Sequence, residues 1–190
     1  MIKKIAVIGG GIIGNSTAWH LANLGHEIIH FDPMQDNIKN SSKKLSGTEA
    51  SLGVLMGEIY TKFSGRGFRL RQISMEMWPE WISALKKYNN QLSIKRPLVK
   101  IANSKLEAQY MERLICKKNN LNLDFLPKDK SIKLLPQFEL NNFGCIISKN
   151  DGRIDPIKLQ ECLKKAISEK KVMTINQKVI FIERKKSIRE

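Results

Sequence analysis

Three glycines, Gly9, Gly11 and Gly14, form the pattern Gly-x-Gly-x-x-Gly, and Asp32 follows about 20 residues further on. Glycines in this spacing let a backbone turn tightly and approach a bulky anion, because no Cβ stands in the way. The unpaired amides at the start of a following helix then attract negative charge. A carboxylate at the position of Asp32 accepts hydrogen bonds from a ribose diol and disfavours a 2′-phosphate. These residues therefore predict a dinucleotide site and argue against NADP.

The segments around the glycines form the unit that such a site requires. Residues 2–8 are apolar and rich in β-branched side chains, which indicates a strand buried on both faces. A second strand over residues 28–31 ends at Asp32. We interpret the whole as a strand, turn, helix and strand that bind a nucleotide; the alternative is a glycine-rich turn without a ligand. The helix ends near Gly25, and its apolar face contains Ile12, Ile13, Ala18, Leu21 and Ala22.

The glycine pattern does not distinguish FAD from NAD. Residues 34–44 are polar and carry no apolar period, whereas an NAD-dependent dehydrogenase would continue with alternating strands and helices. The segment LSGTEASLGVLMGEIY (45–60) mixes small and apolar residues around Gly53, so its backbone could approach a flat ligand, with Thr48 or Ser51 as hydroxyl donors. An ordinary helix start near Thr48 explains the same residues equally well.

Composition and charge argue against two other classes of partner. The formal net charge is +15, but the lysines are scattered along the chain and the few aromatic residues have core spacing, which indicates a solvated surface rather than a nucleic-acid site. No stretch reaches the roughly 18 apolar residues that a transmembrane segment needs. The first residues run directly into the predicted strand instead of forming a signal peptide, so we expect a cytoplasmic protein.

Metal and acid-base sites are not indicated either. The histidines and cysteines lack metal-ligand spacing, and we interpret them as packing or surface residues. Asp151 and Asp155 could suggest a catalytic carboxylate pair, but they occupy a predicted turn and helix start, where aspartate is favoured. No nucleophile elbow or P-loop is present. The histidines are His20, His26 and His30, and the cysteines are Cys116, Cys145 and Cys162.

The middle of the chain predicts the beginning of a second domain. A helical stripe contains Leu70, Ile73, Met77, Trp81 and Leu85, with Pro79 either kinking the helix or starting a new turn. Further along, we expect a strand over residues 96–102, a helix over 104–118, a strand and turn over 143–152, and a helix from Pro156 to about Lys170. Ser104 and Glu107 have the spacing of a capping box.

Three segments together resemble the FAD-dependent amino-acid oxidase family, which includes glycine oxidase and D-amino-acid oxidase. They are IAVIGGGIIG with LANLGHEIIHFDP, then GTEASLGVL, then NDGRIDPIKLQECLKKA, and the likeness covers the whole chain in order. It implies an α/β fold: a Rossmann-like FAD-binding domain with a glutathione-reductase-like βαβ unit, and the start of an α+β substrate domain. The implied boundaries are 1–60 for the FAD unit, 61–155 for the partial substrate domain, and 156–190 for the return to the FAD domain.

The resemblance also implies which residues contact FAD. The glycine loop would hold the pyrophosphate and Asp32 the adenosine ribose, where the family more often has glutamate. The segment NQKVIFIERKK resembles the strand that presents backbone groups to the adenine. Glu49 stands where the family often has a small residue. The implied cofactor contacts are Gly9, Gly11, Ile12, Ile13, Gly14, Asp32, Pro33, Thr48, Ala50, Ser51, Leu52, Gly53 and Val179.

The activity implied by the resemblance is oxidation of the CH–NH bond of a small amino acid, glycine or a D-amino acid, by hydride transfer to flavin. The catalytic residues of the family would lie beyond the position that matches Glu190, so the resemblance implies a truncated chain, and a second chain could supply the missing half. Two alternatives remain open: a non-catalytic nucleotide-binding or interaction module, and an NAD-dependent dehydrogenase.

Overall fold

The computed structural model describes residues 1–33, 47–60, 64–116 and 122–183. The chain divides into two units, which we call unit 1 (Met1–Ser51 with Pro156–Glu190) and unit 2 (Leu52–Asp155). The polar segment 34–44, which carries no apolar period, lies outside the described residues.

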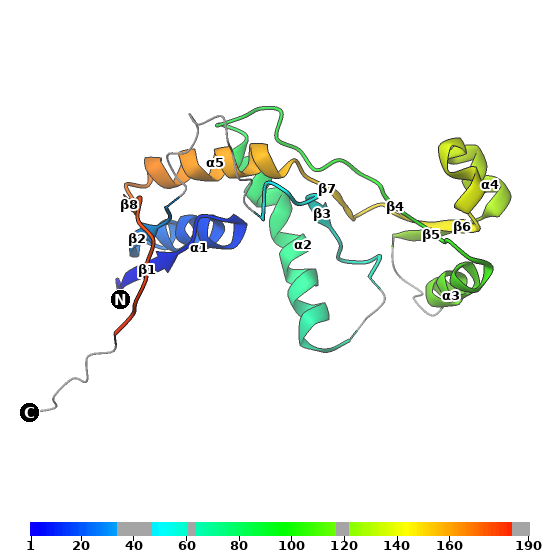
Figure 1. Cartoon of the computed structure of the whole chain (residues 1–190), viewed down its shortest axis with the longest axis horizontal. Helices are drawn as coiled ribbons and strands as arrows, with labels where there is room; N and C mark the ends of the chain where they lie inside the picture. The colour runs from blue at the N-terminus through cyan, green and yellow to red at the C-terminus, as the bar shows by residue number, and fades with distance from the viewer. Residues whose placement is uncertain (34–46, 61–63, 117–121, 184–190) are drawn as a thin grey trace, which may run out of the picture. The chain divides into compact units, whose positions relative to one another are not determined.

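Unit 1 contains a parallel sheet of three strands in the order β1-β2-β8. Hydrogen bonding places β1 and β8 on either side of β2, and the helices α1 and α5 lie next to each other (Figure 1). The predicted strand, turn, helix and strand at the start of the chain are therefore confirmed. The elements are β1 (Lys4–Ile8), α1 (Ile12–Asn23), β2 (Glu27–Phe31), α5 (Pro156–Glu169) and β8 (Met173–Ile175).

One expectation about burial in this unit is wrong, and another holds only in part. In β1 only Val7 is buried and Ile8 is 52% exposed, so the strand is not covered on both faces. On the predicted apolar face of α1, Ala18 is buried as expected, whereas Ile13 is 79% exposed; the other buried residues of the helix are Asn15 and Trp19. A parallel strand is buried on both faces only where other elements cover both faces, and β1 lies at the edge of the described sheet.

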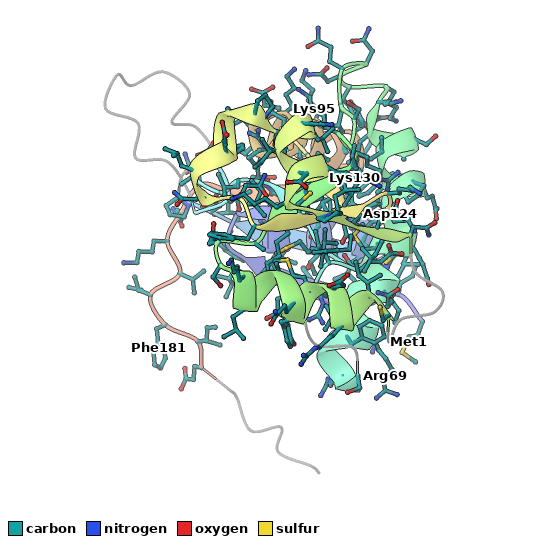
Figure 2. All side chains as sticks on the ribbon, turned by 90° about the vertical axis from the view of Figure 1, so that its right-hand side faces the viewer. Met1, Arg69, Lys95, Asp124, Lys130 and Phe181 are labelled. Carbon is teal, nitrogen blue, oxygen red and sulfur yellow. The ribbon has the colours of Figure 1, made fainter. Side chains whose placement is uncertain are left out.

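The strand expected in the segment NQKVIFIERKK is also misplaced. The strand that joins the sheet is β8, which lies upstream of it, and Ile29 pairs there with Met173. Residues 176–183 are not in a strand, and residues 184–186 lie outside the described part. Phe181, labelled in Figure 2, is 76% exposed. An apolar run has the composition of a strand, but it becomes one only where its backbone finds a partner.

Unit 2 is built around an antiparallel sheet with the order β4-β6-β5. Helix α3 packs its buried residues Ala108, Met111 and Leu114 against Leu123 of β5 and Ile146 of β6. The elements are β3 (Val54–Leu55), α2 (Gly65–Leu85), β4 (Leu98–Ile101), α3 (Lys105–Cys116), β5 (Leu123–Pro127), α4 (Lys128–Leu134), the 3-10 helix η2 (Pro136–Asn141), β6 (Gly144–Ser148) and β7 (Gly152–Arg153). The short strands β3 and β7 pair with each other in antiparallel fashion.

The capping box expected at α3 is confirmed for Ser104, whereas the bond of Glu107 is shifted by one residue to Asn103. The amide of Glu107 donates to the Ser104 hydroxyl at 3.1 Å, and the Glu107 carboxylate accepts from the Asn103 amide at 3.0 Å. These bonds satisfy amides that have no partner within the helix, which fixes where α3 begins. Residues 117 and 118, the last of the predicted helix, lie outside the described part.

Helix α2 only partly follows the predicted stripe. It runs through Pro79 as one helix and buries Ile82 and Leu85, but Leu70 and Ile73 are 58% and 53% exposed. A period of apolar residues identifies one face of a helix without identifying what covers it.

The cysteines differ in their surroundings. Cys116 is exposed, whereas Cys145 and Cys162 are buried, and burial raises the pKa of the Cys162 thiol. Among the described residues, no group of three or more histidine, cysteine, aspartate or glutamate side chains is placed to hold a metal ion. None of the described helices has the length and apolar character needed to cross a membrane.

Candidate functional site

The glycine turn, residues Gly9–Gly11, connects β1 to α1 in unit 1. Gly9 has φ +104°, a conformation that side chains other than glycine rarely adopt, and its amide donates to the Phe31 carbonyl at 2.8 Å. A Cβ on Gly14 would overlap the Gly9 carbonyl oxygen. The first turn of α1 can therefore pack against the glycine turn only because Gly14 has no side chain.

Gly10 and Asp32 are in close contact. A Cβ on Gly10 would overlap the Asp32 carboxylate, which is 8% exposed, and the Asp32 amide donates to the Ile175 carbonyl at 3.0 Å. The aspartate at the end of β2 thus lies beside the turn that precedes α1. In this arrangement one ligand can contact the amides of the turn and a carboxylate together.

Thr48 reaches the same turn from a segment further along the chain. Its hydroxyl oxygen accepts the Ile12 amide at 2.9 Å, at the first residue of α1. Residues 47–50 form turns rather than a helix, and Ser51 stabilises them by donating its hydroxyl to the Thr48 carbonyl at 2.7 Å. Of the two interpretations that the sequence left open, the helix start at Thr48 is therefore wrong.

Gly11 combines an ordinary backbone conformation with an approach that is almost free of neighbouring atoms. Its φ of −72° is available to any residue, and a Cβ placed on it would meet only the Thr48 hydroxyl oxygen, at 3.3 Å. A ligand can therefore approach the backbone here more closely than it could at a residue with a side chain.

The remaining predicted contacts are not all gathered around the turn. Ile13, Pro33 and Ala50 are exposed residues of unit 1, and Val179 is half-buried but lies outside any strand. Leu52 and Gly53 belong to unit 2. Their contacts with a cofactor stay predictions.

The structure also shows three buried polar residues at the turn that sequence reasoning missed. His30 on β2 is bonded through Nε2 to the Gly9 carbonyl at 2.8 Å, and Asn15 and Gln160 both donate to the Gly10 carbonyl. The signal in the sequence was a polar side chain on a face predicted to be buried. Burying such a group costs free energy unless it forms a hydrogen bond. The interpretation of His30 as only a packing or surface residue is therefore incomplete.

The residues at the turn fit the pyrophosphate of a dinucleotide. The first turn of α1 contains no acidic side chain, so the positive end of its dipole meets no carboxylate from its own residues. No Cβ blocks the approach to the Gly11 backbone, and the Thr48 hydroxyl can donate to a phosphate oxygen. Amides, a hydroxyl and a helix N-terminus are the donor groups that bind phosphates in such turns.

Asp151 and Asp155 do not form a catalytic pair. The Asp151 carboxylate is fully buried in unit 2 and accepts the amides of Gly57, Glu58 and Ile59 at 2.7–3.1 Å, whereas Asp155 is exposed. Our interpretation of Asp151 as a turn residue missed this second role, which is to hold a segment more than 90 residues away in the sequence.

Solved structures share this fold. Glycine oxidase from Bacillus cereus ATCC 14579 matches with a TM-score of 0.78 at 19% identity, over 96% of this chain and 49% of that chain. Glycine oxidase from Geobacillus kaustophilus matches with 0.75 at 19% identity, over 92% and 47%. L-α-glycerophosphate oxidase from Mycoplasma pneumoniae, with FAD bound, matches with 0.68 at 21% identity, over 92% and 45%. The chain thus spans about half the length of these structures.

Of the two sequence comparisons, one finds a match. No curated protein matches the chain. The family model described as DAO, FAD dependent oxidoreductase, matches residues 4–189, which is nearly the entire sequence. The chain therefore belongs to the DAO family of FAD dependent oxidoreductases.

Proposed function

We propose that the glycine turn of unit 1 binds the pyrophosphate of FAD and that the protein oxidises the CH–NH bond of a small amino acid. The observation that carries the proposal is the side-chain-free approach at Gly11, next to the Thr48 hydroxyl and the N-terminus of α1. Membership of an FAD dependent family favours FAD over NAD as the dinucleotide.

Each residue at the turn has a proposed task. The Gly11 amide and the amides that follow Ile12 in the first turn of α1 would bind phosphate oxygens. Thr48, whose oxygen accepts the Ile12 amide, would donate its hydroxyl proton to the same group. Asp32, beside Gly10, would accept hydrogen bonds from the adenosine ribose. Bound FAD supplies the hydride acceptor that no side chain can provide. The chain's own contribution in this proposal is binding and orientation.

Replacing Gly11 with alanine should weaken FAD binding by about 100-fold, since the new Cβ would block roughly two phosphate contacts, each contributing about 1.5 kcal/mol. The fold should survive, because the φ of Gly11 suits alanine and Thr48 can yield by a few tenths of an ångström. Titrating the purified protein with FAD and following flavin fluorescence gives the dissociation constant.

Gly67→Ala in α2 is the matched control, because a Cβ there meets only the Arg71 side chain, at 3.8 Å. It should bind FAD like the unaltered protein, and excess NAD should not displace the flavin. Equal affinity in the Gly11 variant and this control would defeat the assignment of the turn.

Amino-acid oxidation is tested separately from binding. Under anaerobic conditions, glycine or a small D-amino acid should reduce the bound flavin and bleach its visible absorption. Glycerol 3-phosphate should leave the spectrum unchanged. If only glycerol 3-phosphate bleaches the flavin, the proposed amino-acid substrate is wrong. If the flavin keeps its colour with every substrate, the result favours the alternative of a non-catalytic nucleotide-binding module.

A further inference from the structure

Two successive carbonyls of the glycine turn are held by buried side chains. His30 Nε2 lies 2.8 Å from the Gly9 oxygen. The Gly10 oxygen accepts from Asn15 Nδ2 at 2.8 Å and from Gln160 Nε2 at 3.1 Å. These side chains come from β2, α1 and α5, and they are 0%, 1% and 4% exposed.

Holding these carbonyls also fixes the direction of two amides. In a trans peptide the C=O and the following N–H point in opposite directions within one plane. The Gly9 carbonyl shares its peptide with the Gly10 amide, and the Gly10 carbonyl shares its peptide with the Gly11 amide. Because both carbonyls are bonded to interior side chains, both amides are directed away from them. Glycine allows many other orientations, so such restraints have more effect here than they would in an ordinary turn.

The pair formed by Asn15 and Gln160 is specific in its orientation. Asn15 Nδ2 donates to the Gly10 oxygen and also to Gln160 Oε1, each at 2.8 Å. The opposite orientation of the Asn15 amide would place its oxygen against those two oxygens. In the observed orientation Asn15 Oδ1 is buried and has no hydrogen-bond partner within the described part of the chain. Burying an acceptor without a hydrogen bond is unfavourable. Buried polar groups that break this rule are expected mainly at functional sites.

We propose that Asn15, His30 and Gln160 are positioning residues that aim the Gly10 and Gly11 amides at the pyrophosphate of FAD. The proposal rests on the proposed function of the turn. None of the three touches the phosphate in this scheme; they act through the carbonyls that they hold. A turn whose amides already point at the ligand loses less conformational freedom on binding, which raises the affinity.

The test compares Gln160→Leu with Ile167→Val, a buried position on the same helix α5. Leucine matches much of the volume of glutamine but cannot donate to Gly10. We expect Gln160→Leu to weaken the binding of FAD and of ADP by about 10-fold, because both ligands carry the pyrophosphate. Ile167→Val should lower stability without changing either affinity. Circular dichroism confirms that both variants are folded.

Asn15→Ala provides a second variant, because it removes the unpaired oxygen and leaves the Gly10 carbonyl bonded to Gln160. It should also weaken FAD binding, and the double variant with Gln160→Leu should depart from additivity, since the two side chains share one carbonyl. Affinities within twofold of the unaltered protein in both single variants would overturn the proposal.

Amide resonances of ¹⁵N-glycine-labelled protein separate this proposal from the proposed function. The chain has 12 glycines, few enough to assign. Loss of Gln160 should shift the Gly10 and Gly11 signals without FAD, while those of Gly65 and Gly67 in α2 stay in place. If the unaltered protein fails to bind FAD, the proposed function fails. If the Gly10 and Gly11 signals of the Gln160→Leu variant do not shift, the positioning proposal fails, because the side chains then do not hold the turn.

Discussion

Replacing Gly14 with alanine is expected to lower the free energy of unfolding of unit 1 by about 3 kcal/mol and to abolish FAD binding. The new Cβ would overlap the Gly9 carbonyl oxygen and lie 2.8 Å from its carbon. The carbonyl cannot easily move aside, because it is also bonded to His30. Since whole domains are stable by only about 5–15 kcal/mol, this loss is a large fraction of the total.

The measurement is urea denaturation followed by Trp19, the tryptophan on α1, in a protein whose other two tryptophans are replaced by phenylalanine. Gly11→Ala is the matched control, because it makes the same chemical change three residues earlier at a permitted φ. The control should stay within about 1 kcal/mol of the unaltered protein. A similar result for Gly14→Ala would show that α1 does not approach the glycine turn as closely as described.

The glycine turn and its helix could be predicted from sequence because their requirements are local. Gly9 needs a conformation that glycine alone adopts readily, and Gly14 needs space beside the Gly9 carbonyl, five residues earlier. The capping box of Ser104 and Glu107 is equally local, since its partners are three residues apart. Signals of this kind do not depend on the rest of the fold.

Burial could not be predicted in the same way. Ile13, Leu70 and Ile73 have apolar side chains at helical spacing, yet each is more than half exposed. Periodicity defines a face, but its cover comes from segments elsewhere in the chain. The strand β8 shows the same dependence, because pairing with β2 selects Met173–Ile175 over the more apolar residues that follow.

The polar contacts of the candidate site were the least predictable. Gln160 meets Asn15 across 145 positions, and no local pattern in either helix indicates its partner. Thr48 reaches Ile12 across 36 positions. The sequence could identify the backbone turn that we propose as the anion site, but the side chains bonded to that turn became visible only in the folded chain.

Asp151 gives the second large expected effect. Asp151→Ala should lower the free energy of unfolding of unit 2 by about 3–5 kcal/mol, because it leaves the buried amides of Gly57, Glu58 and Ile59 without their acceptor. Asp151→Asn retains one oxygen but turns an NH₂ group toward some of these amides, so we expect a loss of about 2 kcal/mol. Denaturation in a Trp19→Phe background reports on unit 2 through Trp78 and Trp81.

Asp124→Ala is the control for this series, because it removes a carboxylate of the same unit that is exposed at the surface. Asp124 pairs with Lys149 at 2.9 Å, with side chains 54% and 62% exposed, and such pairs contribute at most about 1 kcal/mol. The order of stability should therefore be Asp124→Ala, then Asp151→Asn, then Asp151→Ala. If Asp151→Ala is as stable as the control, the three amides must find other acceptors, and the carboxylate is not what holds residues 57–59 in place.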